Sequence, residues 1–330
     1  MPADPKLAHV AQELPAEAPL IACRFDPTGK FVFATSENRS IYRWELAGGK
    51  RIALTGHDSW VFDVIVSGDG KTLISAGGDD TLMWWPADAD APQPAKKVKA
   101  HDGWIRSLAL SPDGKLLASG GNDRMVRTWN AIDGTKAGEF PGAERDIYSV
   151  IFHPGGQWIL GGDLDGKIHQ WETATGKFVR SFDATALHSF NAGQQVHYGG
   201  VRALAFSPDA KSFAAGGLHK GTNPLGNTQQ PLVLRFDWES GKVLRSQVTD
   251  GLNNERIWTL QQHPQGYLIG CTGGQKGQLL FWNDADEKPF HTFALPNTAR
   301  GMSLAKDGLF VATSHHDSKL RITKLAAKAG

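Results

Sequence analysis

The chain has 330 residues, of which 40% are hydrophobic and 21% are charged. This balance is typical of a globular protein that is long enough to bury a large core. The 35 Lys and Arg residues nearly match the 34 Asp and Glu residues, so the formal net charge is only +1. Such a balance excludes a global field that would attract nucleic acid or acidic membrane, and we expect no nucleic-acid partner.

The first residues, MPADPKLAHVAQELPAEAPL, lack the basic start and apolar core of a signal peptide. Nor does the sequence contain a run of about 18 apolar residues that would form a membrane-spanning helix. We therefore predict a cytoplasmic protein without a membrane span. A leader removed earlier would leave no trace in this sequence.

A tight turn recurs seven times along the chain. Its copies read DPTG, SGDG, SPDG, HPGG, SPDA, HPQG and AKDG, and they begin at Asp26, Ser67, Ser111, His153, Ser207, His263 and Ala305. Proline presets φ for a turn, aspartate bonds its own backbone, and glycine accepts a positive φ. Most copies are about 40 to 45 residues apart, which is the period of propeller blades with four strands. The two intervals that flank Ser207 are longer.

The stretch from His101 to Asn130 is the best copy of this repeat. Its predicted strands cover residues 105–110, 116–119 and 125–129, and the turns SPDG and GGND separate them. Three antiparallel strands cannot bury their own faces, so neighbouring sheets must cover them. An aromatic residue ends the third strand in six copies, and only Thr323 replaces it in the last. The six are Trp44, Trp85, Trp129, Trp171, Phe236 and Trp282.

Taken in register, the copies resemble the WD-repeat β-propeller family over essentially the whole chain. The Trp-Asp dipeptide of that family is degenerate, as in Trp44-Glu45, and its Gly-His pair is kept as Gly56-His57. Ala100-His101 and Val196-His197 are weaker versions of the pair. The resemblance implies an all-β fold in which residues 1–330 form one seven-bladed propeller with four antiparallel strands in each blade.

Closure of such a ring needs one more strand. The repeats occupy residues 20–325, the last ends with its third strand at residues 319–325, and only a tail at residues 326–330 follows. We predict that residues 1–19 supply the missing strand, through residues 6–14, and so remove the exposed sheet edges. The alternative is that residues 1–19 form a floppy tail.

In the family, a histidine, a hydroxyl of strand two, a turn aspartate and the tryptophan of strand three hydrogen-bond one another inside a blade. The resemblance carries this structural network to His57, Ser75, Asp79 and Trp85 in blade two, and to His101, Ser119, Asp123 and Trp129 in blade three. Other blades keep only parts of this network. Asp165 and Asp317 keep the turn acid, and Thr272 and Thr313 keep the hydroxyl of strand two. Because a partly satisfied buried network costs stability, blades two and three should be the most rigid.

We predict no catalytic residues, no metal site and no cofactor. His57-Asp58 and His101-Asp102 suggest catalytic pairs, but both histidines fall at network positions. The adjacent residues His315, His316 and Asp317 lie on one turn, and such neighbours rarely converge on one ion. The paired glycines of the repeat fall at one turn, so they are backbone features and not a nucleotide site.

Four isolated residues of reactive types have structural explanations. His153 and His263 replace the turn serine and are expected to be solvated. Cys23 and Cys271 are flanked by apolar strand residues, so we interpret them as buried thiols and not as a disulfide or a metal pair.

One position, at the start of each first strand, is rich in arginine and aromatic residues, a mixture that is enriched at binding hot spots. In the family, the seven residues at this position, one from each blade, form a column that lies at the rim of the channel. The alternative is that rings such as Trp60 and Trp104 pack into the next blade. From blade one to blade seven the column holds Ile21, Phe62, Arg106, Tyr148, Arg202, Trp258 and Arg300, and Trp60, Trp104, Asp146 and Arg256 come just before it.

The two long intervals predict insertions on the same face. FDATALHSFNAGQQVHYGG lies between blades four and five, and LHKGTNPLGNTQQP between strands two and three of blade five. Long loops in compact domains are often binding elements. The positions that face the channel are apolar, apart from Arg24 and Gln261, which disfavours catalysis there. The apolar positions include Ile65, Ala109, Ile151 and Ala205.

We therefore predict a non-catalytic scaffold that binds a protein or peptide, acidic or phosphorylated, and that is monomeric or part of a larger assembly. The alternatives are an enzyme or small-ligand propeller that uses the channel mouth, and an assembly subunit whose partner lies along the blade sides. The predicted partner-binding residues are Trp60, Phe62, Trp104, Arg106, Tyr148, Arg202, Arg256, Trp258 and Arg300.

Overall fold

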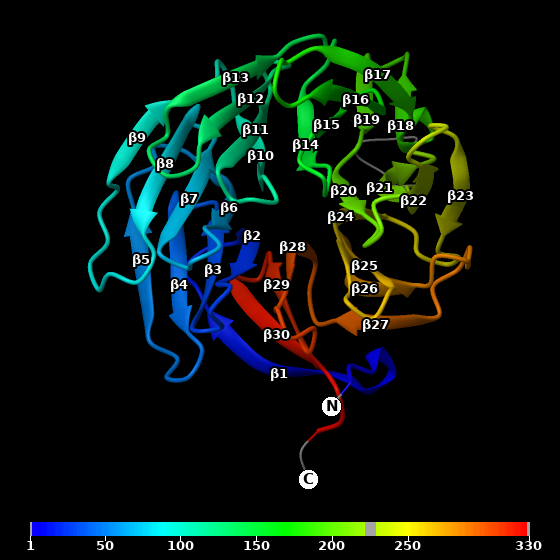
Figure 1. The fold of residues 1–330 in the computed structure, drawn as a ribbon. Helices are drawn as coiled ribbons and strands as arrows, with labels where there is room; N and C mark the ends of the chain where they lie inside the picture. The colour runs from blue at the N-terminus through cyan, green and yellow to red at the C-terminus, as the bar shows by residue number, and fades with distance from the viewer. Residues whose placement is uncertain (1, 222–228, 329–330) are drawn as a thin grey trace.

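The computed structural model describes residues 2–221 and 229–328 of the chain. Its strands form seven four-stranded antiparallel sheets, arranged as the blades of a ring around a central channel (Figure 1). The predicted all-β, seven-bladed propeller is therefore confirmed. In each blade the first strand lies nearest the channel and the fourth lies at the outer edge.

Blades one to three each use four consecutive strands. Blade one contains β2 (Leu20–Phe25), β3 (Phe31–Ser36), β4 (Ser40–Glu45) and β5 (Arg51–Thr55). Blade two contains β6 (Val61–Val66), β7 (Thr72–Gly77), β8 (Thr81–Pro86) and β9 (Lys96–Lys99). Blade three contains β10 (Ile105–Leu110), β11 (Leu116–Gly121), β12 (Val126–Asn130) and β13 (Lys136–Phe140).

Blades four to six follow the same plan. Blade four contains β14 (Ile147–Phe152), β15 (Trp158–Asp163), β16 (Lys167–Glu172) and β17 (Phe178–Asp183). Blade five contains β20 (Ala203–Phe206), β21 (Ser212–His219), β22 (Gln230–Asp237) and β23 (Val243–Val248). Blade six contains β24 (Glu255–Gln262), β25 (Leu268–Gly274), β26 (Gly277–Trp282) and β27 (His291–Leu295).

Blade seven joins the two ends of the chain. It contains β28 (Ala299–Leu304), β29 (Phe310–His315), β30 (Lys319–Leu325) and, as its outer strand, β1 (Ala8–Pro15). β1 pairs with β30 from Ala8 opposite Leu325 to Pro15 opposite Lys319. The prediction of an N-terminal closing strand is confirmed, and the alternative of a floppy tail is wrong.

Large apolar side chains of adjacent blades form the core. The aromatic residue at the end of strand three lies opposite an apolar residue of strand two, as in Trp129 opposite Leu117 and Trp85 opposite Leu73. Trp129 packs in one cluster with Leu82 of blade two. Each buried Leu, Ile or Phe contributes about 1.5 to 3 kcal/mol, so the sheets that cannot stand alone stabilise one another.

The two cysteines are buried and free, as expected. Burial raises the pKa of the Cys23 thiol to about 12 and that of Cys271 well above its ordinary value. Neither thiol is therefore a nucleophile at neutral pH, since the thiolate is the reactive form.

Helix is confined to two short 3₁₀ turns in the described parts of the chain, η1 (Pro5–Leu7) and η2 (Thr185–Leu187). No helix in those parts is long and apolar enough to cross a membrane.

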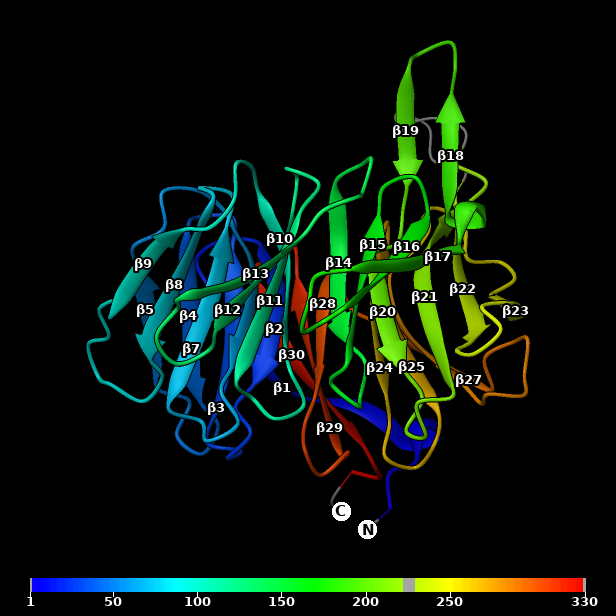
Figure 2. The ribbon, with the colours of Figure 1, turned by 45° about the horizontal axis from the view of Figure 1, so that its top comes forward.

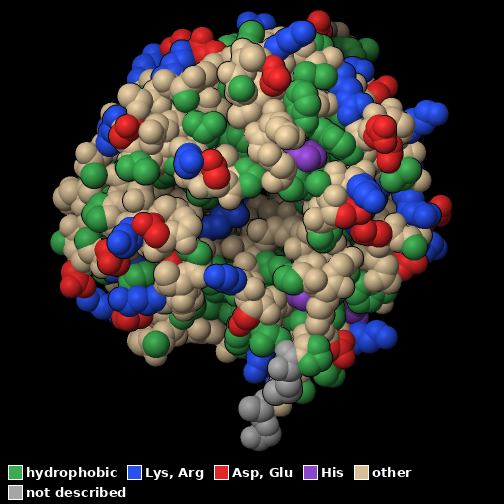
Figure 3. All heavy atoms as spheres, viewed as in Figure 1, with side chains coloured by type: hydrophobic (Ala, Val, Ile, Leu, Met, Phe, Trp, Pro, Cys, Tyr) green, Lys and Arg blue, Asp and Glu red, His purple; other side chains and the backbone are tan. Residues whose placement is uncertain are grey.

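One insertion forms a separate hairpin. β18 (His188–Asn191) and β19 (Val196–Gly199) make a two-stranded sheet that stands out from one face of the ring (Figure 2). The loops that enter the first strand of each blade open on this face, which we call the hairpin face. The opposite face is hollowed where the channel opens, and side chains of both charges are spread around its outer edge (Figure 3).

Candidate functional site

A buried hydrogen-bond network holds the entry to blade two. Ser75 Oγ lies 2.7 Å from His57 Nε2 and accepts a hydrogen bond from Trp85 Nε1 at 2.9 Å. Since a carboxylate can only accept, His57 Nδ1 donates to Asp79 at 3.0 Å. Burial acts to raise the pKa of Asp79, but the hydrogen bond and charge of His57 outweigh it, so this pKa lies well below its ordinary value.

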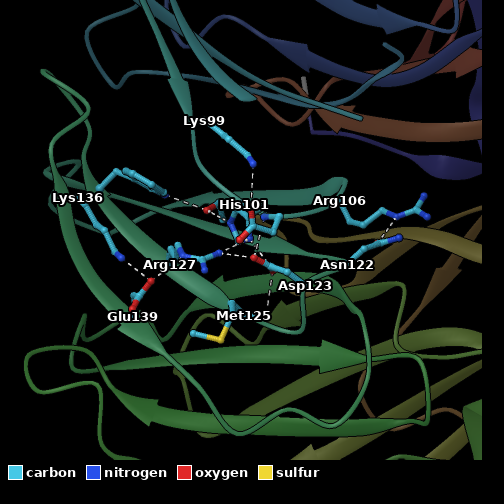
Figure 4. Close-up of polar contacts among 12 residues, drawn as sticks. Lys99, His101, Arg106, Asn122, Asp123, Met125, Arg127, Lys136 and Glu139 are labelled. Carbon is cyan, nitrogen blue, oxygen red and sulfur yellow. Dashed lines mark hydrogen bonds and ion pairs between the residues drawn. The ribbon is translucent and has the colours of Figure 1, made fainter. Parts of the chain in front are cut away.

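The same bonds recur in blade three (Figure 4). Ser119 Oγ lies 2.7 Å from His101 Nε2 and accepts from Trp129 Nε1 at 2.9 Å, and His101 Nδ1 donates to Asp123 at 2.8 Å. Arg127 adds an ion pair with Asp123 at 2.5 Å. These bonds tie the loop that enters strand one to the turn between strands two and three. They therefore hold the loops of the hairpin face in position.

The nine predicted partner-binding residues all lie around the channel mouth on the hairpin face. Arg106 lies over the ring of Trp104, with 4.6 Å to its centre, and Arg256 lies over the ring of Trp258 at 5.3 Å. These contacts connect Trp104 and Arg256 to the other seven predicted residues, which line the cavity in the central channel. The seven are Trp60, Phe62, Arg106, Tyr148, Arg202, Trp258 and Arg300.

Guanidinium groups and aromatic rings alternate around the mouth. The Arg106 guanidinium lies 4.7 Å from the centre of the Phe62 ring and 5.3 Å from that of Tyr148. Arg202 lies 3.7 Å from the Tyr148 ring and 5.7 Å from that of Trp258. Such cation–π contacts contribute about 0.5 to 2 kcal/mol each. They hold the guanidinium groups in place without forming ion pairs.

Two tryptophans extend this ring outward. Trp60 and Trp104 both contact Phe62, with ring centres 6.3 and 5.4 Å apart, and each remains 44% exposed. Trp104, which precedes blade three, therefore packs on blade two as the alternative states, but both tryptophan rings keep an exposed surface. Both offer apolar area to a partner.

Three of the four arginines have no ion-pair partner among residues 2–221 and 229–328. Arg106 Nε donates to Asn122 at 2.9 Å, Arg202 Nε to the Gly199 carbonyl at 2.9 Å, and Arg256 Nη2 to Gln229 at 3.2 Å. Arg300 alone is paired, with Glu37 at 2.6 Å.

Burial and neighbouring positive charges lower the pKa values of the arginines at the mouth. Burial, followed by the charges of Arg202 and Arg300, lowers the pKa of Arg256 to about 10. Burial likewise lowers the pKa of Arg202 and of Arg106. An anion at the mouth would relieve this repulsion.

The channel below the mouth forms a cavity of about 900 Å³. Its wall includes the predicted apolar residues Ile65, Ala109, Ile151 and Ala205. The two polar exceptions have structural contacts. Arg24 lies 3.8 Å from Asp63, and Gln261 accepts a hydrogen bond of 2.6 Å from the Leu304 amide. The charged groups available to a ligand are therefore concentrated at the mouth.

The two insertions lie side by side at this mouth. A Cβ built on Gly221, at the end of the described part of the blade-five insertion, would lie 3.3 Å from Cβ of Tyr198 in the hairpin. Phe190 of the hairpin is 48% exposed. Residues 222–228 of the blade-five insertion lie outside the described residues.

The sequence model of the WD domain, G-beta repeat family matches residues 49–86, 92–130, 134–172 and 187–221. The first three matches run from the outer strand of one blade to the third strand of the next. With seven four-stranded blades closed into a ring, these matches decide the family. The chain belongs to the WD-repeat β-propeller family.

Relatives of this propeller include proteins of two kinds. It is 24% identical to eukaryotic translation initiation factor 3 subunit I of Candida glabrata over 83% of this chain and 76% of that protein. It is 36% identical to nuclear distribution protein nudF 2 of Talaromyces marneffei over 28% of this chain and 18% of that protein. A match to the nudF 2 protein of Aspergillus clavatus spans 17% of that protein. The chain thus spans under a fifth of these two nuclear distribution proteins.

Two predictions about histidines of this propeller are wrong. His263 is buried, stacks on Tyr267 with ring centres 4.1 Å apart and contacts the Gly308 carbonyl at 2.9 Å. His153 packs against Phe206 and Trp238. Neither ring is fully solvated, because the turn of one blade packs on the next: His263 is buried and His153 is half-buried.

The weaker Gly-His copy at Val196-His197 does not form a network in blade five, because His197 lies on the projecting hairpin. In blade four a different buried pair replaces the network. His169 Nε2 contacts Asp163 at 2.9 Å, and both side chains are buried. Sequence reasoning missed this pair because His169 falls at the position that Arg127 holds in blade three.

The triplet His315, His316 and Asp317 does not converge, as expected. His315 is fully buried and contacts Thr313 and the Asn297 carbonyl at 2.8 and 3.0 Å. His316 is exposed, and Asp317 pairs with Arg321 at 2.6 Å.

A different cluster of metal-ligand types was not foreseen. Asp165, His188 and His197 place one side-chain oxygen or nitrogen each within 4.8 Å of one another. The signal in the sequence is two histidines near the two ends of one insertion. Only the pairing of the hairpin and its position beside blade four bring them together.

Proposed function

We propose that this propeller is a non-catalytic interaction module that binds a protein or peptide segment on the hairpin face. The segment carries carboxylates or phosphates that pair with Arg106, Arg202 and Arg256. Trp60 and Trp104 supply apolar contact area at the edge of the same site. The observation that carries this proposal is the set of three half-buried arginines that have no ion-pair partner in the described parts of the chain.

Charge-assisted hydrogen bonds from arginine to carboxylate or phosphate are strong and geometrically specific, because the guanidinium group donates along two parallel bonds. The cation–π contacts hold the guanidinium groups before a partner arrives. Less side-chain entropy is then lost on binding. Aromatic residues and arginine are also the types most enriched among interface hot spots.

The names of the relatives agree with such a role. One relative is named as a subunit of a translation initiation factor, and others are named as nuclear distribution proteins. We propose that this chain likewise acts within a larger assembly. A cytoplasmic location and a monomeric free state stay predictions.

The test uses an array of peptides of equal length that are neutral, glutamate-rich or phosphoserine-containing. We expect the wild-type protein to retain the anionic peptides, and the double variant Arg106→Ala/Arg202→Ala to lose them while it stays folded. The control Arg51→Ala/Arg245→Ala removes the same charge from the outer strands β5 and β23. Equal retention by the two double variants, or retention of neutral peptides alone, would contradict the proposal.

The channel cavity of about 900 Å³ favours a second candidate, a propeller that binds a small ligand at the channel mouth. A thermal-shift screen against anionic metabolites separates the two. A compound that raises the melting temperature of wild-type protein, but not of the Arg106→Ala/Arg202→Ala variant, would support the second candidate.

A further inference from the structure

The cluster formed by Asp165, His188 and His197 lies where the hairpin meets blade four. Asp165 follows β15 in the turn that leads to β16, whereas His188 begins β18 and His197 lies on β19. His188 Nε2 is 2.9 Å from His197 Nδ1, and Asp165 Oδ1 is 3.6 and 3.3 Å from these two nitrogens. One atom of each side chain therefore faces the same small space.

Strand pairing explains why the two imidazoles meet. In the hairpin, His188 lies opposite Gly199 and Phe190 lies opposite His197. Side chains two residues apart in a strand share a face, so His188 and His197 are diagonal neighbours on one face. The ring of Phe190 lies 4.7 Å from the ring of His197 and limits its movement.

The carboxylate is oriented from the side away from the histidines. Arg145 Nε donates to Asp165 Oδ2 at 2.9 Å. The other oxygen, Oδ1, is buried and accepts no hydrogen bond from any residue that the structure describes. A buried acceptor without a hydrogen-bond donor is costly, and this oxygen lies beside two imidazole nitrogens, where a bound cation would compensate its charge.

We propose that Asp165 Oδ1, His188 Nε2 and His197 Nδ1 bind one Zn²⁺ ion. Imidazole nitrogens and a carboxylate oxygen suit Zn²⁺, whereas Mg²⁺ and Ca²⁺ prefer oxygen ligands alone. Two ligand atoms about 2.0 Å from a tetrahedral ion lie about 3.3 Å apart. The three distances of 2.9, 3.3 and 3.6 Å bracket this value.

The remaining contacts fit a zinc site. Arg145 contacts only the oxygen that faces away from the ion, so it acts as an orienting partner of the ligand. Three protein ligands leave a fourth position for water or for a side chain of a partner.

The ion would fasten the hairpin to the ring. An isolated two-stranded hairpin is marginally stable in water, and β18 and β19 pair only with each other among the described strands. Zinc joins both hairpin strands to the β15–β16 turn. Because Arg202 Nε donates to the Gly199 carbonyl at the base of the hairpin, this anchor also fixes one side of the channel mouth.

The test titrates ZnCl₂ into the full-length, tag-free and EDTA-treated protein in the presence of a chromophoric zinc chelator. We expect one Zn²⁺ per wild-type chain, and affinity weakened at least about tenfold in His188→Gln and His197→Gln. The matched control is His316→Gln, which removes an exposed histidine far from the cluster in sequence. Equal zinc binding by His188→Gln, His197→Gln and the wild-type protein would overturn the site.

A second measurement keeps the test independent of folding. The two substituted histidines lie on the hairpin, outside the seven blades, so the variants should keep the wild-type melting temperature in EDTA. Zinc should slow proteolytic cleavage between residues 188 and 199 in the wild-type protein and in His316→Gln, and not in His188→Gln. Cleavage at the same rate with and without zinc in the wild-type protein would overturn the anchoring role.

Discussion

At the scale of single residues, one hydroxyl connects two buried groups in each complete network. In blade three, Ser119 Oγ bonds both His101 Nε2 and Trp129 Nε1, and all three side chains are buried. The hydroxyl donates to the imidazole and accepts from the indole, so no other small side chain except threonine has the required chemistry. Burial alone would allow any small apolar residue at position 119, whereas these hydrogen bonds require a hydroxyl group.

Replacing Ser119 by alanine should destabilise the protein by about 2 to 4 kcal/mol, because it leaves the buried His101 and Trp129 nitrogens without partners. Urea unfolding followed by tryptophan fluorescence measures this loss. The control Ser240→Ala removes an exposed hydroxyl and should change stability by less than about 0.5 kcal/mol. A loss of equal size in both variants would show that the network contributes nothing.

His315 makes the folded ring sensitive to acid. Burial, reinforced by the charge of Arg321, lowers its pKa from 6.5 to about 4. The unfolded chain takes up the proton near the ordinary pKa, so between these values it binds more protons than the folded chain. Acidification through this range therefore favours unfolding.

From about pH 7.5 to about pH 5, His315 should account for roughly 2 kcal/mol of lost stability. Urea unfolding at both pH values should show a smaller pH dependence for His315→Gln than for the wild-type protein. The exposed neighbour serves as control, and His316→Gln should keep the wild-type dependence. An unchanged pH dependence in His315→Gln would contradict the assignment.

At the scale of elements, β1 closes the ring and covers the edge of β30. Leu14 of β1 is 5% exposed, lies opposite Leu320 and packs in the cluster between blades seven and one. Arg321 of β30 bonds Glu13 at 2.7 Å. The first strand in the sequence is thus held by packing as well as by its backbone ladder.

Leu14→Ala should lower the free energy of unfolding by about 2 to 5 kcal/mol, because it leaves a cavity at the closing seam. Leu7→Ala is the matched control, since Leu7 is 48% exposed. Thermal unfolding by circular dichroism compares the two variants. Equal melting temperatures would mean that β1 contributes little to closure.

At the scale of the whole molecule, closure of the seven blades brings the equivalent residues of the repeats together as a ring of charged and aromatic side chains. Arg106 and Arg202 come from blades three and five, and the ring of Tyr148 in blade four lies near both guanidinium groups. This geometry concentrates positive charge although the molecule as a whole has a net charge of only +1. The local field, and not the net charge, decides which partner the mouth attracts.

Binding of an anionic peptide at the mouth should weaken as salt rises, because added ions screen the exposed part of this field. Fluorescence anisotropy from about 0.05 to about 0.3 M NaCl measures the dependence. The slope should be as steep for Arg51→Ala/Arg245→Ala as for the wild-type protein, whereas Arg106→Ala/Arg202→Ala should stay unbound over the whole range. A wild-type affinity that is independent of salt would contradict pairing with charged groups.

The fold could be predicted from local features. Turns such as SPDG limit the backbone conformation directly, and the apolar strands between them need a neighbouring sheet, so the repeat predicted the seven blades. The residues of the two complete networks occur at fixed spacings within one blade. Their bonds could be expected because each depends on short-range geometry that every copy of the repeat shares.

Other features depended on contacts between segments far apart in sequence. His263 is buried because a neighbouring turn covers it, and the zinc cluster forms because the hairpin pairs in one register beside the turn at Asp165. Neither the registry of an insertion nor the packing of one blade on the next is encoded by residue spacing. The sequence by itself determined the repeat and its closure, whereas the tertiary structure decided which side chains meet, since burial and charge compensation depend on distance in space.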